Sequence, residues 1–143
     1  MFLARLNYQV QATDISDVAI NYLQEQAAKY NLKIHPRVCD LTELKNLNWQ
    51  NQSFHLVVIT YYLDRKLFPL VKSIIKESGY FFMETFHQSP QIEDQGVFNQ
   101  YKLQPKVLLA EFSDWTVLFL KKMNKRDGKR YFVRNGNFGA GAF

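Results

Sequence analysis

Cysteine, glycine and proline are all scarce in this sequence, with one, six and four residues respectively, and each scarcity excludes a class of structure. The single cysteine, Cys39, excludes an internal disulfide and a zinc site built from several thiolates, and it favours a reducing cytoplasm. No apolar run approaches the roughly 18 residues of a membrane-spanning helix, and residues 1–6 lack the apolar stretch of a secretory signal. We therefore expect a cytoplasmic protein without a membrane partner.

Glycine is absent from the chain before Gly79. Loops that cradle phosphate need glycine, because the backbone must approach the ligand without a Cβ atom in the way. The first half of the chain therefore holds no glycine-rich nucleotide-binding loop.

The length and the charge of the chain indicate one basic globular domain. In 143 residues there are 18 Lys and Arg against 13 Asp and Glu, which gives a formal net charge of +5. A chain of this length can bury a sizeable core, and a hydrophobic content of 47% excludes a disordered chain. The basic balance permits a nucleic-acid partner but does not argue for one.

Positive charge gathers near the C-terminus in a group that we call the basic cluster. Its members are Lys121, Lys122, Lys125, Arg126, Lys129, Arg130 and Arg134. Such a cluster either binds the phosphates of a nucleic acid or forms the solvated surface of a hairpin. Aromatic side chains on which bases could stack are not interspersed among these charges. We therefore favour the solvated surface and disfavour nucleic acid as a partner.

The first 40 residues predict a strand, a helix and a second strand. Residues 8–14 alternate like a short strand, and Ser16 then suits the N-cap of a helix. The helix carries an apolar stripe and ends near Asn31, which tolerates a left-handed conformation. The stripe consists of Ala19, Ile20, Leu23, Ala27 and Tyr30. Residues 33–38 predict the second strand, which must lie at a sheet edge because it contains Pro36.

The remainder predicts a second alternation of strands and helices. Residues 54–60 are typical of a strand buried on both faces. A helical stripe (Leu67, Leu70, Val71 and Ile74) follows, which Gly79 would close before a strand at 80–85. After a polar stretch at 87–99, residues 106–112 predict a short helix, and 115–123 and 129–133 predict a hairpin around Asp127-Gly128.

This order of elements predicts an α/β fold of the Rossmann-like class, with a mainly parallel sheet and a C-terminal antiparallel hairpin. We expect one domain over residues 1–134 and a frayed tail over residues 135–143, which are rich in small residues. In such sheets, ligands bind beyond the carboxyl ends of the strands.

Two acidic residues stand where the first two predicted strands end. Asp14 could accept both hydroxyls of a ribose, or it could cap the following helix or a turn. Asp40 could accept from the amine of a base, or it could cap a short helix over residues 42–47. The three histidines (His35, His55 and His87) lie far apart and at no zinc-ligand spacing from Cys39, so we expect no metal site.

Taken together, these features resemble the class I methyltransferases that use S-adenosylmethionine, and most closely the small bacterial tellurite-resistance-type group. The features are Asp14 after the first strand, Asp40 after the second, and the buried run 54–58 as the third. Further matches are residues 61–65 (Tyr-Tyr-Leu-Asp-Arg), 79–86 and 112–115. The likeness covers about residues 1–134.

The resemblance implies S-adenosylmethionine as the cofactor and assigns residues to it. In that family, an acidic residue after strand two binds the ribose, and an Asp and its following residue after strand three bind adenine. Here these would be Asp14 with Ile15, and Asp40 with Leu41, and Tyr61 would also contact the cofactor.

Three residues would lie near the cofactor's methyl group if the topology holds, namely Tyr61, Glu84 and His87. For each one singly, we favour pocket lining or a purely structural role. Methyl transfer is an in-line displacement with a good leaving group, so it needs a general base only where the acceptor must lose a proton. The sequence does not identify the acceptor.

The family pattern also begins with a strand and an Asp/Glu-x-Gly-x-Gly-x-Gly loop, which have no counterpart here. The resemblance implies an N-terminally truncated domain that starts in the following helix, at residues 2–6. Without that strand, its two neighbours would lie about 9–10 Å apart. We expect weak or absent cofactor binding by the chain alone, and self-association through the exposed sheet edges.

The sequence leaves three functions open. The first is S-adenosylmethionine-dependent methyl transfer to an unidentified acceptor, impaired by the loss of the glycine-rich loop. The second is a non-catalytic binding or assembly module that uses the basic cluster. The third is a truncated remnant without a separate function.

Overall fold

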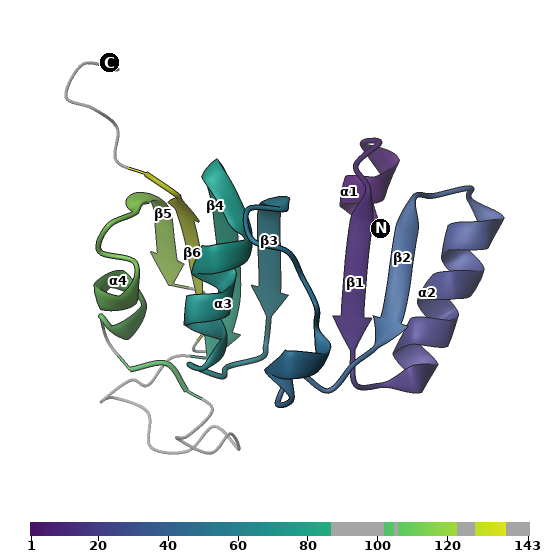
Figure 1. Ribbon diagram of the computed structural model, residues 1–143, viewed down its shortest axis with the longest axis horizontal. Helices are drawn as coiled ribbons and strands as arrows, with labels where there is room; N and C mark the ends of the chain where they lie inside the picture. Colours follow the sequence, from purple (N-terminus) through teal and green to yellow (C-terminus); the bar gives the residue numbers. More distant parts are fainter. Residues whose placement is uncertain (87–101, 105, 123–127, 137–143) are drawn as a thin grey trace. The chain divides into compact units, whose positions relative to one another are not determined.

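The computed structural model describes residues 1–86, 102–104, 106–122 and 128–136. These residues form two compact units, residues 1–48 and the described part of residues 49–143. Figure 1 shows the helices and strands of both units with their labels. Among the described residues, no helix is long and apolar enough to cross a membrane.

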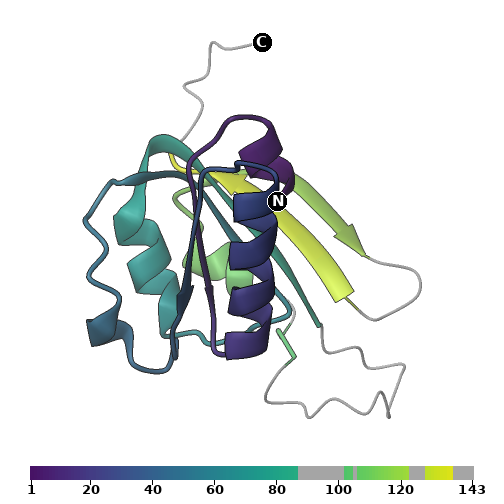
Figure 2. The same ribbon diagram turned by 90° about the vertical axis from the view of Figure 1, so that its right-hand side faces the viewer.

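The first unit is a two-stranded parallel sheet with one long helix. Its elements are α1 (Phe2–Arg5), β1 (Val10–Asp14), α2 (Asp17–Lys29), β2 (Ile34–Val38) and the 3₁₀ helix η1 (Leu44–Asn46). The strands pair in register from Val10 with Ile34 to Asp14 with Val38. In Figure 2, α2 lies along these two strands, which it contacts. Pro36 is on β2, which pairs with β1 alone among the described strands, so its predicted place on an edge strand is confirmed.

Local signals set the limits of α2 as the sequence predicts. The Ser16 hydroxyl accepts a hydrogen bond from the backbone N–H of Ala19 at 3.2 Å, which makes Ser16 the N-cap. Asn31 adopts φ 50° just after the helix. The predicted apolar stripe was too wide, because Ala19 and Tyr30 are exposed. A sheet of two strands covers only part of the helix, and Ile20 is its buried residue.

The second unit is a mixed four-stranded sheet with two helices. Its elements are β3 (Phe54–Thr60), α3 (Leu67–Ile74), β4 (Ile75–Phe86), α4 (Val107–Glu111), β5 (Thr116–Lys122) and β6 (Gly128–Arg134). The strand order is β3-β4-β6-β5, with β3 and β4 parallel and β6 antiparallel to both of its neighbours. The predicted C-terminal hairpin is confirmed, and its second strand lies inside the sheet.

The core of the second unit joins α3 and α4 to one face of this sheet. It is built from large apolar side chains that alternate along the strands and recur along the helices. They include Phe68, Val71 and Ile74 of α3, Leu108 of α4, Phe81 and Met83 of β4, Tyr131 and Val133 of β6, and Phe112 and Trp115. Burial of these side chains is the main source of stability in this unit.

Two predictions for the second unit were wrong in detail. Gly79 does not end α3, because the chain passes directly into β4 at Ile75, which pairs with Phe54. Gly79 instead lies in β4, where a Cβ atom would approach Ile75 Cγ2 to 2.7 Å. The strand β3 is not buried on both faces, since Val58 is 47% exposed and His55 and Thr60 are also exposed. The core described above covers the face of β3 that carries Val57 and Ile59, and Val58 and Thr60 lie on the opposite face.

Some predictions concern residues outside the described part of the chain. They are the polar stretch 87–99, including His87, the turn residue Asp127, and residues 137–143 of the tail. Lys125 and Arg126 of the basic cluster also lie outside it.

Candidate functional site

The two candidate acidic residues of the first unit, Asp14 and Asp40, lie at the same end of its sheet. Because β1 and β2 are parallel neighbours, their carboxyl ends meet at one edge. Asp14 is the last residue of β1, and its C=O accepts a hydrogen bond from the backbone N–H of Cys39 at 2.8 Å. Asp40 follows Cys39, so both carboxylates stand at adjacent strand ends, as the sequence predicts.

Asp14 takes part in the turn between β1 and α2. Its Oδ1 atom accepts a hydrogen bond from the backbone N–H of Ser16 at 2.9 Å. The alternative of a turn residue is thus present in the structure. Within the described residues, Oδ2 makes no hydrogen bond, and the side chains of Asp14 and Ile15 are both exposed.

Asp40 takes part in a turn of its own. Its Oδ1 atom accepts from the Thr42 backbone N–H at 2.9 Å and from the Thr42 hydroxyl at 2.7 Å. The hydrogen bond from the Thr42 hydroxyl, followed by that from its N–H, lowers the pKa of Asp40 below the usual value. The predicted cap of a helix over 42–47 is wrong, since η1 begins at Leu44 and has no side-chain cap.

In the second unit, Tyr61, Glu84 and Arg130 form one hydrogen-bonded group, which we call the Glu84 triad. Tyr61 directly follows β3. Glu84 lies on β4, where it is the register partner of Thr60 on β3 and of Arg130 on β6. The Tyr61 hydroxyl donates to Glu84 Oε1 at 2.6 Å, and Arg130 Nε donates to Glu84 Oε2 at 2.8 Å. Each carboxylate oxygen therefore has its own donor.

The triad keeps Glu84 ionised in a nearly buried position. Its exposed fraction is 9%. The hydrogen bond from Tyr61, followed by the hydrogen bond and charge of Arg130, lowers the pKa of Glu84, although burial opposes this shift. The carboxylate therefore accepts hydrogen bonds at neutral pH and donates none.

Tyr61 has a left-handed backbone, with φ 55°, which is unusual for a bulky side chain. Its backbone N–H donates a hydrogen bond to the Glu84 C=O at 2.7 Å. The centroid of its ring lies 5.4 Å from the ring centroid of Phe86. These contacts hold a conformation that costs about 1–3 kcal/mol. Strain of this kind is concentrated at functional sites, and Tyr61 stands at the carboxyl end of a parallel strand.

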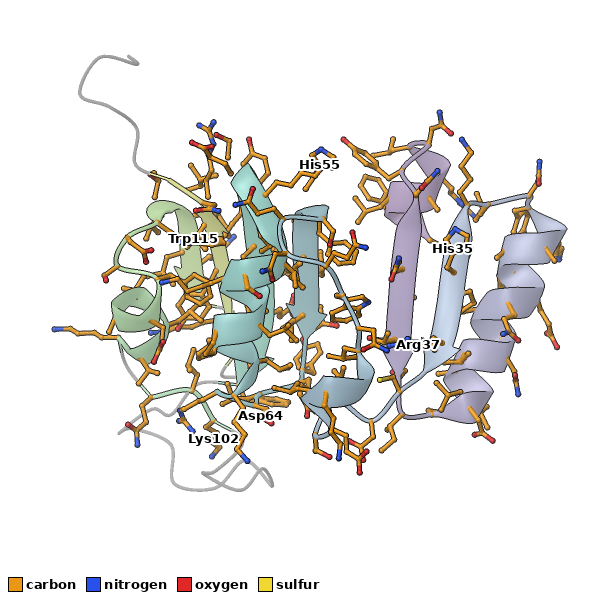
Figure 3. All side chains as sticks on the ribbon, viewed as in Figure 1. His35, Arg37, His55, Asp64, Lys102 and Trp115 are labelled. Atoms are coloured by element: carbon orange, nitrogen blue, oxygen red, sulfur yellow. The ribbon has the colours of Figure 1, made fainter. Side chains whose placement is uncertain are left out.

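The two histidines in the described part of the chain, His35 and His55, lie away from these strand ends. In Figure 3, His55 lies at the opposite end of β3 from Asp64, and His35 lies part-way along β2. His55 Nε2 is 3.3 Å from Lys76 Nζ. Among the described residues, no group of three His, Cys, Asp or Glu side chains could hold a metal ion.

One member of the basic cluster in the described part of the chain, Arg130, has an acidic partner. Arg130 donates its Nε to Glu84, and Lys129 and Arg130 pair with Lys122 and Lys121 across the hairpin. Sequence reasoning placed Arg130 only in this cluster and so missed its link to Glu84. The signal that could have found it is a pair of opposite charges facing each other on neighbouring strands.

A family model described as tellurite resistance protein TehB matches residues 1–118 of the chain. The chain belongs to the TehB family. The resemblance to the tellurite-resistance-type group of class I methyltransferases is thereby confirmed. A search of curated proteins found no match to the sequence.

Solved structures share the fold of this TehB-family chain. TehB from Haemophilus influenzae aligns with a TM-score of 0.76 at 18% identity, over 94% of this chain and 52% of that protein. A S-adenosylmethionine-dependent methyltransferase from Methanosarcina mazei aligns with a TM-score of 0.71 at 15% identity, over 94% of this chain and 85% of that one. The Rossmann-like α/β fold class is therefore confirmed.

A third structure was solved with ligands bound. It is geranyl diphosphate C-methyltransferase from Streptomyces coelicolor, in complex with Mg²⁺, geranyl diphosphate and S-adenosyl-L-homocysteine. It aligns with a TM-score of 0.74 at 9% identity, over 95% of this chain and 66% of that protein. The TehB-family chain described here spans about half the length of Haemophilus influenzae TehB.

Proposed function

We propose that this chain binds S-adenosylmethionine and serves methyl transfer to an acceptor. The observation that carries the proposal is the position of Asp14 and Asp40 at adjacent carboxyl ends of parallel strands in a TehB-family chain. Ligands of open α/β sheets bind at such strand ends. S-adenosyl-L-homocysteine bound to the Streptomyces coelicolor enzyme, and sinefungin bound in another structure of a geranyl diphosphate methyltransferase, support the same assignment.

The proposed contacts follow from the two strand ends. Asp14, with Ile15 beside it, accepts the ribose hydroxyls through its Oδ2 atom, while Oδ1 remains in the turn with Ser16. Asp40 accepts from the adenine amine, and Leu41 completes the contact with the base. Tyr61, which follows β3 in the second unit, is proposed as a cofactor contact on the family resemblance alone. In this assignment, the hydrogen bonds that Oδ1 of each aspartate accepts in its turn fix the orientation of the carboxylate. The Oδ2 atom of each aspartate is then left to bind the nucleoside.

The affinity of the chain for S-adenosylmethionine should be low. The first half of the chain holds no glycine-rich loop, so backbone N–H groups of that kind do not reach the methionine part of the cofactor. The nucleoside contacts alone remain, and the activity of the chain is correspondingly impaired. We further propose that the chain associates with itself through its sheet edges, because β5 is an outer strand with four consecutive exposed apolar residues, Val117 to Leu120.

Photo-crosslinking to labelled S-adenosylmethionine tests the cofactor proposal. We expect the wild-type chain to be labelled, unlabelled cofactor to compete, and Asp14→Ala and Asp40→Ala each to reduce labelling several-fold, since each loses a charged hydrogen-bond acceptor. Asp17→Ala is the matched control, because Asp17 is an exposed carboxylate in the same unit whose Oδ1 accepts from the N–H of Val18. Labelling that is absent, or equal in all four proteins, would refute the assignment.

A further inference from the structure

Glu84 is a nearly buried carboxylate that the nucleoside contacts proposed above do not use. It lies in the middle of the Glu84 triad, between the β3 end and β6. A buried charge costs free energy unless it is paired and hydrogen-bonded, so its presence in a sheet needs a physical explanation.

The surroundings of Glu84 do not suit a role in general-base catalysis. In that role Tyr61 would take a proton from the acceptor while its own hydroxyl proton moved to Glu84 Oε1. The Tyr61 hydrogen bond and Arg130 both stabilise the charged carboxylate, and the pKa of Glu84 is lowered accordingly. A carboxylate with a lowered pKa is a poor proton acceptor, so the surroundings of Glu84 oppose proton transfer to it.

The geometry favours a different role. Glu84 contacts Tyr61 twice, once through its backbone C=O, which accepts from the Tyr61 N–H at 2.7 Å, and once through Oε1, which accepts from the Tyr61 hydroxyl at 2.6 Å. These two bonds tie both ends of the tyrosine, its backbone and its hydroxyl, to one residue. Arg130 holds the other carboxylate oxygen at 2.8 Å and so restricts rotation of the Glu84 side chain.

We infer that Glu84 is a positioning residue that holds Tyr61 in its left-handed conformation and sets the orientation of the tyrosine side chain for a ligand at the carboxyl end of β3. The inference rests on the proposed function for the identity of that ligand, S-adenosylmethionine. Because the hydroxyl proton of Tyr61 is committed to Glu84, Tyr61 does not act as a proton donor to the ligand. Arg130 takes part by orienting Glu84.

A double-mutant cycle tests whether Glu84 acts through Tyr61. The variants are Glu84→Gln, Tyr61→Phe and the two combined, and the readout is the dissociation constant for S-adenosylmethionine from calorimetry on the full chain. We expect each single variant to weaken binding about threefold to tenfold, the range set by one hydrogen bond. The double variant should bind as Tyr61→Phe does, because Glu84 has no effect without the hydroxyl. Glu77→Gln, an exposed glutamate on the same strand, should leave binding unchanged.

A second readout does not depend on cofactor binding. The ¹³Cζ resonance of Tyr61, assigned by its loss in Tyr61→Phe, reports the hydrogen bond of the hydroxyl. It should shift in Glu84→Gln and stay in place in Glu77→Gln, with circular dichroism showing that both variants fold.

The outcomes distinguish failure of the positioning role from failure of the proposed function. Equal and additive losses in the cycle, or no loss in Glu84→Gln, would overturn the positioning role, as would an unchanged Tyr61 resonance. If the wild-type chain binds no S-adenosylmethionine, the proposed function fails. The Tyr61 resonance then decides alone whether Glu84 holds the tyrosine.

Discussion

Glu84 makes the stability of the second unit depend on pH. Its folded-state pKa is lowered, first by the Tyr61 hydroxyl and then by Arg130. A group of this kind stabilises the fold above its unfolded pKa, about 4.3 for a glutamate, and this contribution is lost as the pH falls through the folded value. The triad therefore favours folding at neutral pH and ceases to do so in acid.

We predict that the wild-type chain loses more unfolding free energy on acidification from about pH 5 than Glu84→Gln does, because the glutamine has no charge to lose. Tyr61→Phe should reduce the dependence in the same direction, since it removes the larger cause of the shift. Urea unfolding at several pH values measures this. The same pH slope in the wild type and Glu84→Gln would contradict the prediction.

For individual residues, part of the candidate site could be predicted from the sequence. Asp14 and Asp40 were placed correctly because a strand end can be located from local alternation and turn residues. The link between Glu84 and Arg130 could not be predicted, since it depends on β6 pairing with β4. Residues 46 positions apart in the sequence are brought together by that pairing alone.

Elements with local signals were predicted well. The limits of α2 depend on Ser16 and Asn31, each of which acts on its own neighbours in the chain. Gly79 misled the prediction for α3, because the helix ends where Ile75 pairs with Phe54, which is a long-range contact. Gly79 is required instead by the close approach of Ile75 and the Lys76 C=O.

The packing of α3 and α4 on the sheet depends on Phe112. Its ring centroid lies 5.0 Å from that of Trp115, 5.1 Å from that of Phe81 and 5.8 Å from that of Phe68. We predict that Phe112→Ala destabilises the chain by about 3–5 kcal/mol, because it removes these contacts and leaves a cavity. Phe119→Ala, at an exposed site on β5, is the control. Urea unfolding measures both, and similar losses in the two variants would argue against Phe112 as a centre of the core.

The outer strand β5 is the element that we expect to mediate self-association. Its apolar residues 117–120 are all at least 40% exposed. We predict that the chain sediments as a concentration-dependent mixture of species and that Leu118→Lys shifts it toward monomer, because a charge on an edge strand opposes strand pairing. Sedimentation velocity measures the change. A wild-type chain that stays monomeric at all concentrations would refute this role of β5.

At the scale of the whole molecule, the two units differ in how much they bury. The first unit buries few apolar side chains, including Ile20, Ile34 and Leu47, over a sheet of two strands. The second unit has the large aromatic and aliphatic core described above. A two-stranded sheet is only marginally stable alone, so the first unit should open more readily.

We predict that amides of β1 and β2 exchange with deuterium faster than those of β4 and β6. Hydrogen exchange followed by mass spectrometry resolves the two units by their peptides. Equal protection of β1 and β4 would show that the units unfold together.

The position of β6 also affects how the chain folds during synthesis. It is the last of the described strands to be made, yet it pairs with β4 on one side and β5 on the other. While residues 87–134 are being synthesised, the side of β4 that β6 covers has no strand partner. At synthesis rates of about 5–20 residues per second, this interval lasts for seconds, during which chaperones can recognise the exposed strands.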